Sequence, residues 1–130
     1  PPPSPPPSPF LQEPRVNIEI KPSDNDVTVV EISGSVDSLT ADQLLAALTA
    51  QLGAQRVRLV ADFSAVAYTS SAGLRALLAT VKDARRHGGD FRLAAVQPPV
   101  LRVLELSGFT SILKMFGDVD AAVASYRVGA

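Results

Sequence analysis

The sequence contains no cysteine and only one histidine, His87, among its 130 residues. Without cysteine, disulfide bonds, thiolate catalysis and thiolate metal sites are all excluded. A lone histidine among scattered acidic residues forms no metal-binding cluster, and we expect neither a metal nor a cofactor. The missing cysteine also fits a cytoplasmic protein, and the cytoplasm is the location that we expect.

An excess of charge and long apolar runs are missing as well. Twelve basic residues against thirteen acidic ones give a net charge of −1, whereas a nucleic-acid-binding protein normally carries a basic face. The main basic cluster, Lys82 with 85–87, lies at a predicted helix end, where basic side chains are favoured. No apolar run reaches the roughly 20 residues of a membrane-spanning helix, and the chain does not open with a secretory signal. We therefore expect no nucleic acid partner and no membrane insertion.

Proline and serine are concentrated in residues 1–14, PPPSPPPSPFLQEP. This tract cannot supply the backbone donors of a helix or sheet, so we expect a disordered tail or linker. A PxxP ligand for a recognition domain is the alternative. Because the chain does not begin with methionine, we expect either a longer protein or a processed end. Residues 15–130 have the size of one globular domain.

Hydrophobic periodicity divides this domain into alternating strands and helices. We predict strands at 16–20, 27–36, 56–62, 90–96 and 111–116. We predict helices starting near Thr40, which forms a capping-box pattern with Gln43, at Ser71, at Pro98, and at Asp118 or Asp120. The order β-β-α-β-α-β-α-β-α predicts an α/β fold. Its sheet should be mixed but mainly parallel, with four to five strands, an antiparallel first strand and about four flanking helices.

In open α/β sheets, functional groups lie beyond the carboxyl ends of the strands. Of the three such stretches, 34–39, 62–74 and 96–99, only the second is unusual; it reads D-F-S-A-V-A-Y-T-S-S-A-G-L. Catalysis by its serines requires a base, but His87 lies at the far end of the predicted helix, some 20 Å away. No G-x-S-x-G, Walker or G-x-G-x-x-G motif is present. We therefore expect no enzyme, and a ligand binder or hydrolase using Ser71 is a remote alternative.

Two chemical roles fit the serines at the start of this helix. Ser70 or Ser71 can be an N-cap that accepts a hydrogen bond from a free main-chain amide. Either can instead accept phosphate, whose charge the positive end of the helix dipole tolerates. Asp37 and Asp62, both expected at neighbouring strand ends, would make the modified surface strongly negative.

The segments 62–66 and 68–74 together resemble the signature of STAS domains, the family of the anti-sigma factor antagonists. The stretch 32–37, I-S-G-S-V-D, resembles the second strand of the same family. Leu104, Gly108 and Phe109 resemble its later L-x-x-x-G motif. The resemblance extends from Val16 to the end of the chain and implies the STAS fold.

The resemblance also implies a function. Anti-sigma factor antagonists bind an anti-sigma factor, often a serine kinase, in the unphosphorylated state; the kinase phosphorylates them, which releases them, and a phosphatase resets them. The family's acceptor serine falls on Ser71, with Ser70 as the alternative because it replaces the family's acidic residue. Gly73 should allow close backbone approach, and Leu74 should anchor the helix in the core. The expected partner-binding residues are Asp37, Asp62, Tyr68, Thr69, Ser70, Ala72 and Gly73.

A second function remains open, a STAS-like regulatory domain of a larger protein such as an anion transporter or a sensor complex. The proline tract and the missing methionine favour this alternative. The compact domain, without an insertion before the second helix, favours the free antagonist. Exposed apolar residues near Leu39 or Phe109 would also allow a homodimer.

Overall fold

The computed structural model describes residues 16–126, and the proline-rich stretch at 1–14 lies outside them. The strands are β1 (Val16–Pro22), β2 (Thr28–Val36), β3 (Arg58–Thr69), β4 (Asp90–Ala94) and β5 (Met115–Phe116). The helices are α1 (Ala41–Gly53), α2 (Ser71–Arg86), α3 (Pro98–Leu106) and α4 (Val119–Ala124), with short 3₁₀ helices at Asp24–Asp26 and Phe109–Ser111. The predicted order of strands and helices is confirmed. Within residues 16–126, no helix combines the length and the apolar character needed to cross a bilayer.

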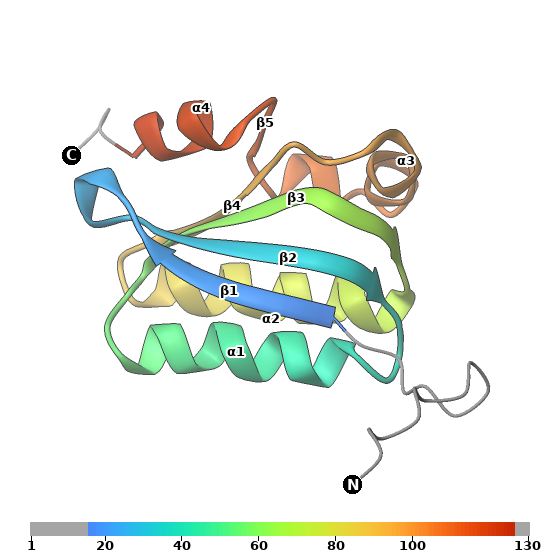
Figure 1. Ribbon diagram of the computed structural model, residues 1–130, viewed down its shortest axis with the longest axis horizontal. Coiled ribbons are helices and arrows are strands. Elements are labelled where there is room, and N and C mark those ends of the chain that lie inside the picture. Colours follow the sequence, from blue (N-terminus) through green and yellow to red (C-terminus); the bar gives the residue numbers. More distant parts are fainter. Residues whose placement is uncertain (1–15, 127–130) are drawn as a thin grey trace, which may run out of the picture.

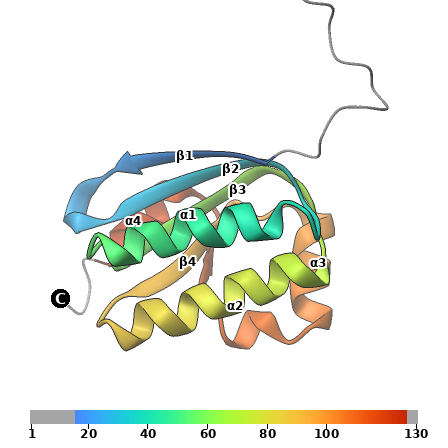
Figure 2. The same ribbon diagram turned by 90° about the horizontal axis from the view of Figure 1, so that it is seen from below.

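The five strands form one sheet in the order β1-β2-β3-β4-β5. As predicted, β1 pairs antiparallel with β2, and the other neighbours are parallel. Helices α1 and α2 lie side by side on one face of the sheet (Figure 2), and α4 covers part of the opposite face (Figure 1). The parallel connections therefore place helices on both faces, as the α/β class requires.

The main core lies between the sheet and the pair α1 and α2. Apolar residues recur at helical spacing on both helices and turn toward the strands, and each contributes about 1.5–3 kcal/mol by burial. On α2, Leu74, Leu77 and Val81 are buried, whereas Leu78 is half-buried. The largest fully buried side chains of the strands in this core are Ile32, Leu59, Phe63, Phe91 and Leu93.

Strand β3 is longer than predicted, because the sequence pattern ended it at Asp62 and the structure extends it to Thr69. Its register with β2 shifts twice, between Glu31 and Ser33 and between Gly34 and Ser35. Each shift gives β3 one extra residue, so its buried positions recur every third residue at Phe63, Val66 and Thr69 rather than every second. The second half of β3 therefore lacks the alternation of apolar and polar residues by which a strand is predicted from sequence.

The longer strand overturns the predicted position of Asp62. This residue lies in the middle of β3, opposite Glu31 of β2, and its carboxylate accepts a hydrogen bond from the Ser64 amide at 2.9 Å. At about 3.3 Å per residue, Asp62 is roughly 20 Å along the strand from Thr69. It is therefore not at the carboxyl edge beside Asp37.

Three predicted local features also have a clear outcome. The capping box at Thr40 is wrong, because the Thr40 amide donates to the Asp37 carboxylate and not to the Gln43 side chain, and the Thr40 hydroxyl caps no amide of α1. The Gln43 side chain instead donates to the Val16 carbonyl at 3.1 Å. At the last helix, Asp118 is the N-cap and accepts from the Ala121 amide at 2.7 Å, which decides between Asp118 and Asp120. The predicted edge strand at 111–116 is confirmed only for its last two residues, since a 3₁₀ helix precedes it.

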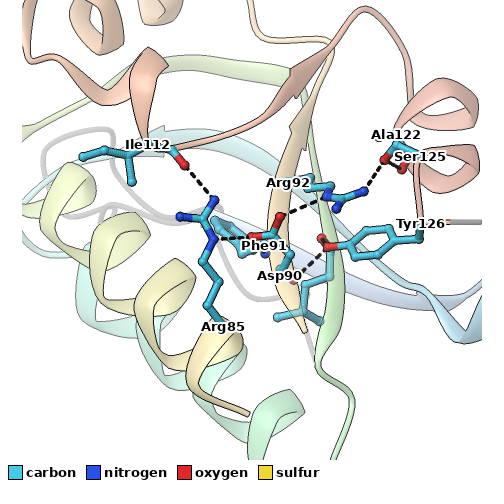
Figure 3. A network of polar contacts seen from close by, with 9 residues as sticks. Arg85, Asp90, Phe91, Arg92, Ile112, Ala122, Ser125 and Tyr126 are labelled. Atoms are coloured by element: carbon cyan, nitrogen blue, oxygen red, sulfur yellow. Dashed lines mark hydrogen bonds and ion pairs between the residues drawn. The ribbon is translucent and has the colours of Figure 1, made fainter. Parts of the chain in front are cut away.

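A buried carboxylate joins α2, β4 and the C-terminal part of the described chain (Figure 3). Asp90 accepts from Arg85 Nε at 2.9 Å through one oxygen and from Arg92 Nε at 3.0 Å through the other. The Arg92 guanidinium lies 3.9 Å from the centroid of the Tyr126 ring, a cation–π contact. Two guanidinium groups thus compensate one buried carboxylate, an arrangement that is destabilising to break.

Tyr126 fixes the other side of this network. Its one hydroxyl proton is shared between the main-chain carbonyls of Leu59, at 2.8 Å, and Asp90, at 2.7 Å. Burial raises the pKa of Tyr126 well above its ordinary value, so the hydroxyl remains a donor. The tyrosine therefore ties the segment after α4 to two adjacent strands.

We expect Tyr126→Phe to lower the free energy of unfolding by about 1–2 kcal/mol, because it removes the buried hydroxyl proton that two main-chain carbonyls share. Urea denaturation followed by circular dichroism measures this loss. Tyr68→Phe is the matched control. Because Tyr68 is 52% exposed, loss of its hydroxyl should leave the free energy of unfolding unchanged. Equal stability of the two variants would contradict the role assigned to Tyr126.

Candidate functional site

The two serines between β3 and α2 have different roles in the structure. Ser70 is the N-cap of α2: its backbone is extended, with φ −97° and ψ 175°, and its hydroxyl accepts from the Gly73 amide at 3.2 Å. Ser71 is the first helical residue, and it is exposed. The cap role that the sequence left open between them therefore belongs to Ser70, and the Ser71 side chain faces solvent.

The first turn of α2 lies unusually close to the end of β2. A Cβ atom on Gly73 would be 2.4 Å from Thr69 Oγ1 and 2.8 Å from Val36 Cγ1, both shorter than real contacts. The Ser70 amide also donates to the Val36 carbonyl at 2.8 Å. The predicted close approach at Gly73 is confirmed, and it holds Ser71 beside the chain that leaves β2.

A tight turn follows β2 directly. One carboxylate oxygen of Asp37, Oδ1, accepts from the amides of Leu39 and Thr40, each at 2.9 Å. The Thr40 hydroxyl accepts from the Asp37 amide and donates to the Ser35 carbonyl, also at 2.9 Å. The hydrogen bond from the Thr40 amide, with the one from Leu39, holds the pKa of Asp37 below its usual value. A carboxylate thus remains charged at the edge of the sheet next to α2.

Two large apolar side chains are exposed at this edge. Leu39, in the turn after β2, is 70% exposed, and Tyr68, near the end of β3, is 52% exposed. Together with Asp37 and Ser71 they form what we call the Ser71 surface. Such a mixture of apolar and charged groups is typical of a protein-binding surface.

Not all of the predicted partner-binding residues reach this surface. Asp37, Tyr68, Ser70 and Ala72 are exposed or half-buried at the edge, whereas Thr69 and Gly73 are buried. Thr69 and Gly73 therefore shape the surface from beneath. The remaining predicted residue, Asp62, lies elsewhere on β3, as described above.

The groups needed for hydrolytic chemistry are far from the serines. His87 is the C-cap of α2, and the 16 residues of this helix place it roughly 24 Å from Ser71. Among residues 16–126, no group of three or more His, Asp or Glu side chains is arranged to hold a metal ion. Within the described residues, the one imidazole of the sequence therefore lies at the opposite end of α2 from Ser71.

Comparison with known proteins agrees with this geometry. Residues 17–122 match the family model of the STAS domain. The chain belongs to the STAS domain family. Its predicted fold and family are therefore confirmed.

Relatives of this STAS chain are named as anti-sigma factor antagonists. BtrV of Bordetella bronchiseptica, assigned to that group by its name, is 38% identical over 96 residues, covering 74% of this chain and 83% of BtrV. The crystal structure of an anti-sigma factor antagonist from Mycobacterium paratuberculosis is 29% identical, with a TM-score of 0.79, and covers 87% of this chain and 95% of its own. A sulfate transporter family protein from Wolinella succinogenes is similar in fold, at 22% identity and a TM-score of 0.72, covering 83% of this chain and 90% of its own.

Sequence reasoning missed two parts of this STAS site. It assigned Thr40 to a helix cap, although its hydroxyl closes the turn with Asp37, and it considered Leu39 only for self-association. The spacing Asp-x-x-Thr after a strand is a signal for such a turn. Phe109, grouped with Leu39 as exposed, is half-buried.

We expect Gly73→Ala to destabilise the fold by about 1–3 kcal/mol, because the added methyl group overlaps Thr69 and Val36. Chemical denaturation of both proteins measures the difference. Gly53→Ala is the control: nothing lies within 4 Å of its added methyl group, and alanine favours the helix by up to about 1 kcal/mol. A stable Gly73→Ala protein would contradict the proposed contact.

We expect the carboxyl group of Asp37 to titrate below the usual aspartate range, which carboxyl-carbon NMR measures. Because its pKa is lowered on folding, its stabilising effect is present above the unfolded pKa and is lost as the pH falls through the folded pKa. Asp37→Asn, which keeps an oxygen acceptor without the charge, should remove this pH dependence. A midpoint at or above the ordinary aspartate value would refute the turn geometry.

Proposed function

We propose that this STAS chain is an anti-sigma factor antagonist that acts in the cytoplasm. In its unphosphorylated state it binds an anti-sigma factor of the serine-kinase type through the Ser71 surface. Phosphorylation of Ser71 by this partner releases the chain, and a phosphatase restores the binding form. The names of its relatives and the composition of the surface support the proposal.

The observation that carries the choice of Ser71 is the hydrogen bond from the Gly73 amide to Ser70 Oγ, at 3.2 Å. Modifying Ser70 would disturb the N-cap of α2, a contribution of about 1 kcal/mol. Modifying Ser71 disturbs no hydrogen bond of its side chain within the described part of the chain. Ser71 is also exposed on the first turn of α2, so its hydroxyl is accessible to a kinase.

The release step follows from charge. Phosphate adds about −1.5 to −2 charges at neutral pH, next to the turn that holds Asp37. A partner surface suited to Leu39, Tyr68 and a neutral serine would then have to desolvate a phosphate, which is strongly unfavourable without a cationic partner. The dipole of α2 stabilises the phosphate in the free domain by roughly 0.3–1 kcal/mol. Modification would therefore weaken binding while the fold is kept.

A second candidate is a STAS-like regulatory domain within a larger protein such as an anion transporter. The similarity in fold to the Wolinella succinogenes transporter-family protein and the proline-rich stretch before Val16 favour it. Such a domain would not require a kinase partner for Ser71.

The test is capture of partners from a lysate of the source organism, with the parent chain, Ser71→Asp and Ser71→Ala as baits and mass spectrometry as the readout. We expect the parent and Ser71→Ala to retain an anti-sigma factor with a kinase fold. Ser71→Asp should retain at least ten times less, because its carboxylate imitates part of the phosphate charge. The captured protein, with ATP, should then phosphorylate the parent chain on Ser71.

Ser70→Asp is the matched control for charge at the start of α2, since aspartate also caps helices well. It should bind more like the parent than Ser71→Asp does. Phosphate found on Ser70 would move the switch to that residue. If neither the parent nor Ser71→Ala retains a kinase-fold protein, the antagonist is refuted and a regulatory domain of a larger protein becomes the better proposal.

A further inference from the structure

The outer face of α2 continues the Ser71 surface along the helix. Arg75 is exposed and follows Ser71 by four residues, so the two side chains project from the same side of the helix. Lys82 and Arg86 lie further along this face, which is lined in addition by Leu78, Ala79 and one acidic residue, Asp83. This basic row begins one turn after the proposed phosphoacceptor.

The arginines and lysines near this face differ in how they are engaged. Arg85 pairs with Asp90, and Arg86 lies 3.3 Å from Asp83. For Arg75 and Lys82, the structure of residues 16–126 contains no ion pair within 4 Å and no side-chain hydrogen bond. Of these two side chains, only Arg75 lies within one helical turn of Ser71, because Lys82 is about 10 Å further along the axis.

We propose that Arg75 holds the phosphate of phosphorylated Ser71 in an ion pair between positions i and i+4 of α2. This inference rests on the proposed function, because it concerns the modified form of the same serine. Side chains four residues apart on a helix have Cβ atoms about 6 Å apart, and the order of acid first and base second is the favourable one. A guanidinium group also matches a phosphate with two parallel hydrogen bonds.

The pair would extend the effect of phosphorylation beyond Ser71. In the unmodified chain Arg75 faces solvent and is available to an acidic group of a partner. In the phosphorylated chain it would be occupied by the phosphate, so the partner would meet a new anion and lose a cation at the same time. Asp37, the acidic side chain of the neighbouring turn, repels the phosphate. Arg75, one turn after Ser71 on α2, attracts it.

The test uses the full chain with phosphoserine placed at position 71 by genetic encoding, so that no kinase is required. Phosphorus NMR follows the second ionisation of the phosphate during a pH titration of the parent, Arg75→Gln and Arg75→Lys. An adjacent guanidinium favours the dianion, so the second pKa in the parent should be lower than in Arg75→Gln by about 0.15–0.4. Arg75→Lys should restore part of the difference, and 1 M salt should reduce it.

Lys82→Gln and Arg102→Gln are the controls, since each removes one exposed cation and keeps a good helix former. In both controls the second pKa of the phosphate should equal that of the parent. Proton–nitrogen spectra verify that every variant is folded. Equal phosphate pKa values in the parent and Arg75→Gln, or equal changes in the two controls, would overturn the pair. A confirmed pair with no kinase-fold partner captured would refute the proposed function alone, because the phosphate here is installed without a kinase.

Discussion

The contact between the first turn of α2 and the end of β2 is the constraint on which the candidate site depends. It requires a residue without a side chain at Gly73, because Val36 and Thr69 occupy the space that a Cβ atom would need. The main-chain hydrogen bond from Ser70 to Val36 fixes the same two segments in register. Everything exposed at this edge, from Leu39 to Ser71, is positioned by a contact that is itself buried.

The two register shifts of β3 act on the same edge. Each adds one residue to β3 relative to β2, so that Tyr68 and Thr69 pair with Ser35 and Val36. With this register Thr69 points into the core beneath Gly73, while Tyr68 points outward. Without the two shifts, Val66 and Ala67 would pair with Ser35 and Val36, and Tyr68 would extend past the end of β2. The irregular strand thus sets which aromatic group a partner can meet.

The network around Asp90 stabilises the opposite part of the molecule. It joins the end of α2, the start of β4 and the segment after α4 through charges that are compensated within the fold (Figure 3). The two ends of α2 therefore differ in kind. At its C-terminal end the arginine Arg85 is engaged by Asp90, whereas at its N-terminal end Ser71 and Arg75 face solvent. Because Arg85 and Arg86 of the basic cluster at 82–87 are paired with Asp90 and Asp83, fewer of its charges are free for a partner than the sequence suggests.

Local physical rules let the sequence determine the order of strands and helices, the start of α2 at Ser71 and the apolar face with Leu74. Periodicity and capping preferences act over a few residues, so they can be read without the fold, whereas the need for glycine at 73 arises from its contact with Val36 of β2. Only the tertiary structure decided the length of β3, the position of Asp62, the turn between Asp37 and Thr40, and the choice of Ser70 as the cap. These features depend on which main-chain groups of distant segments pair with one another. They also depend on which of several amides donates to a given carboxylate or hydroxyl oxygen. Such a competition is decided by three-dimensional packing, which a linear pattern does not contain.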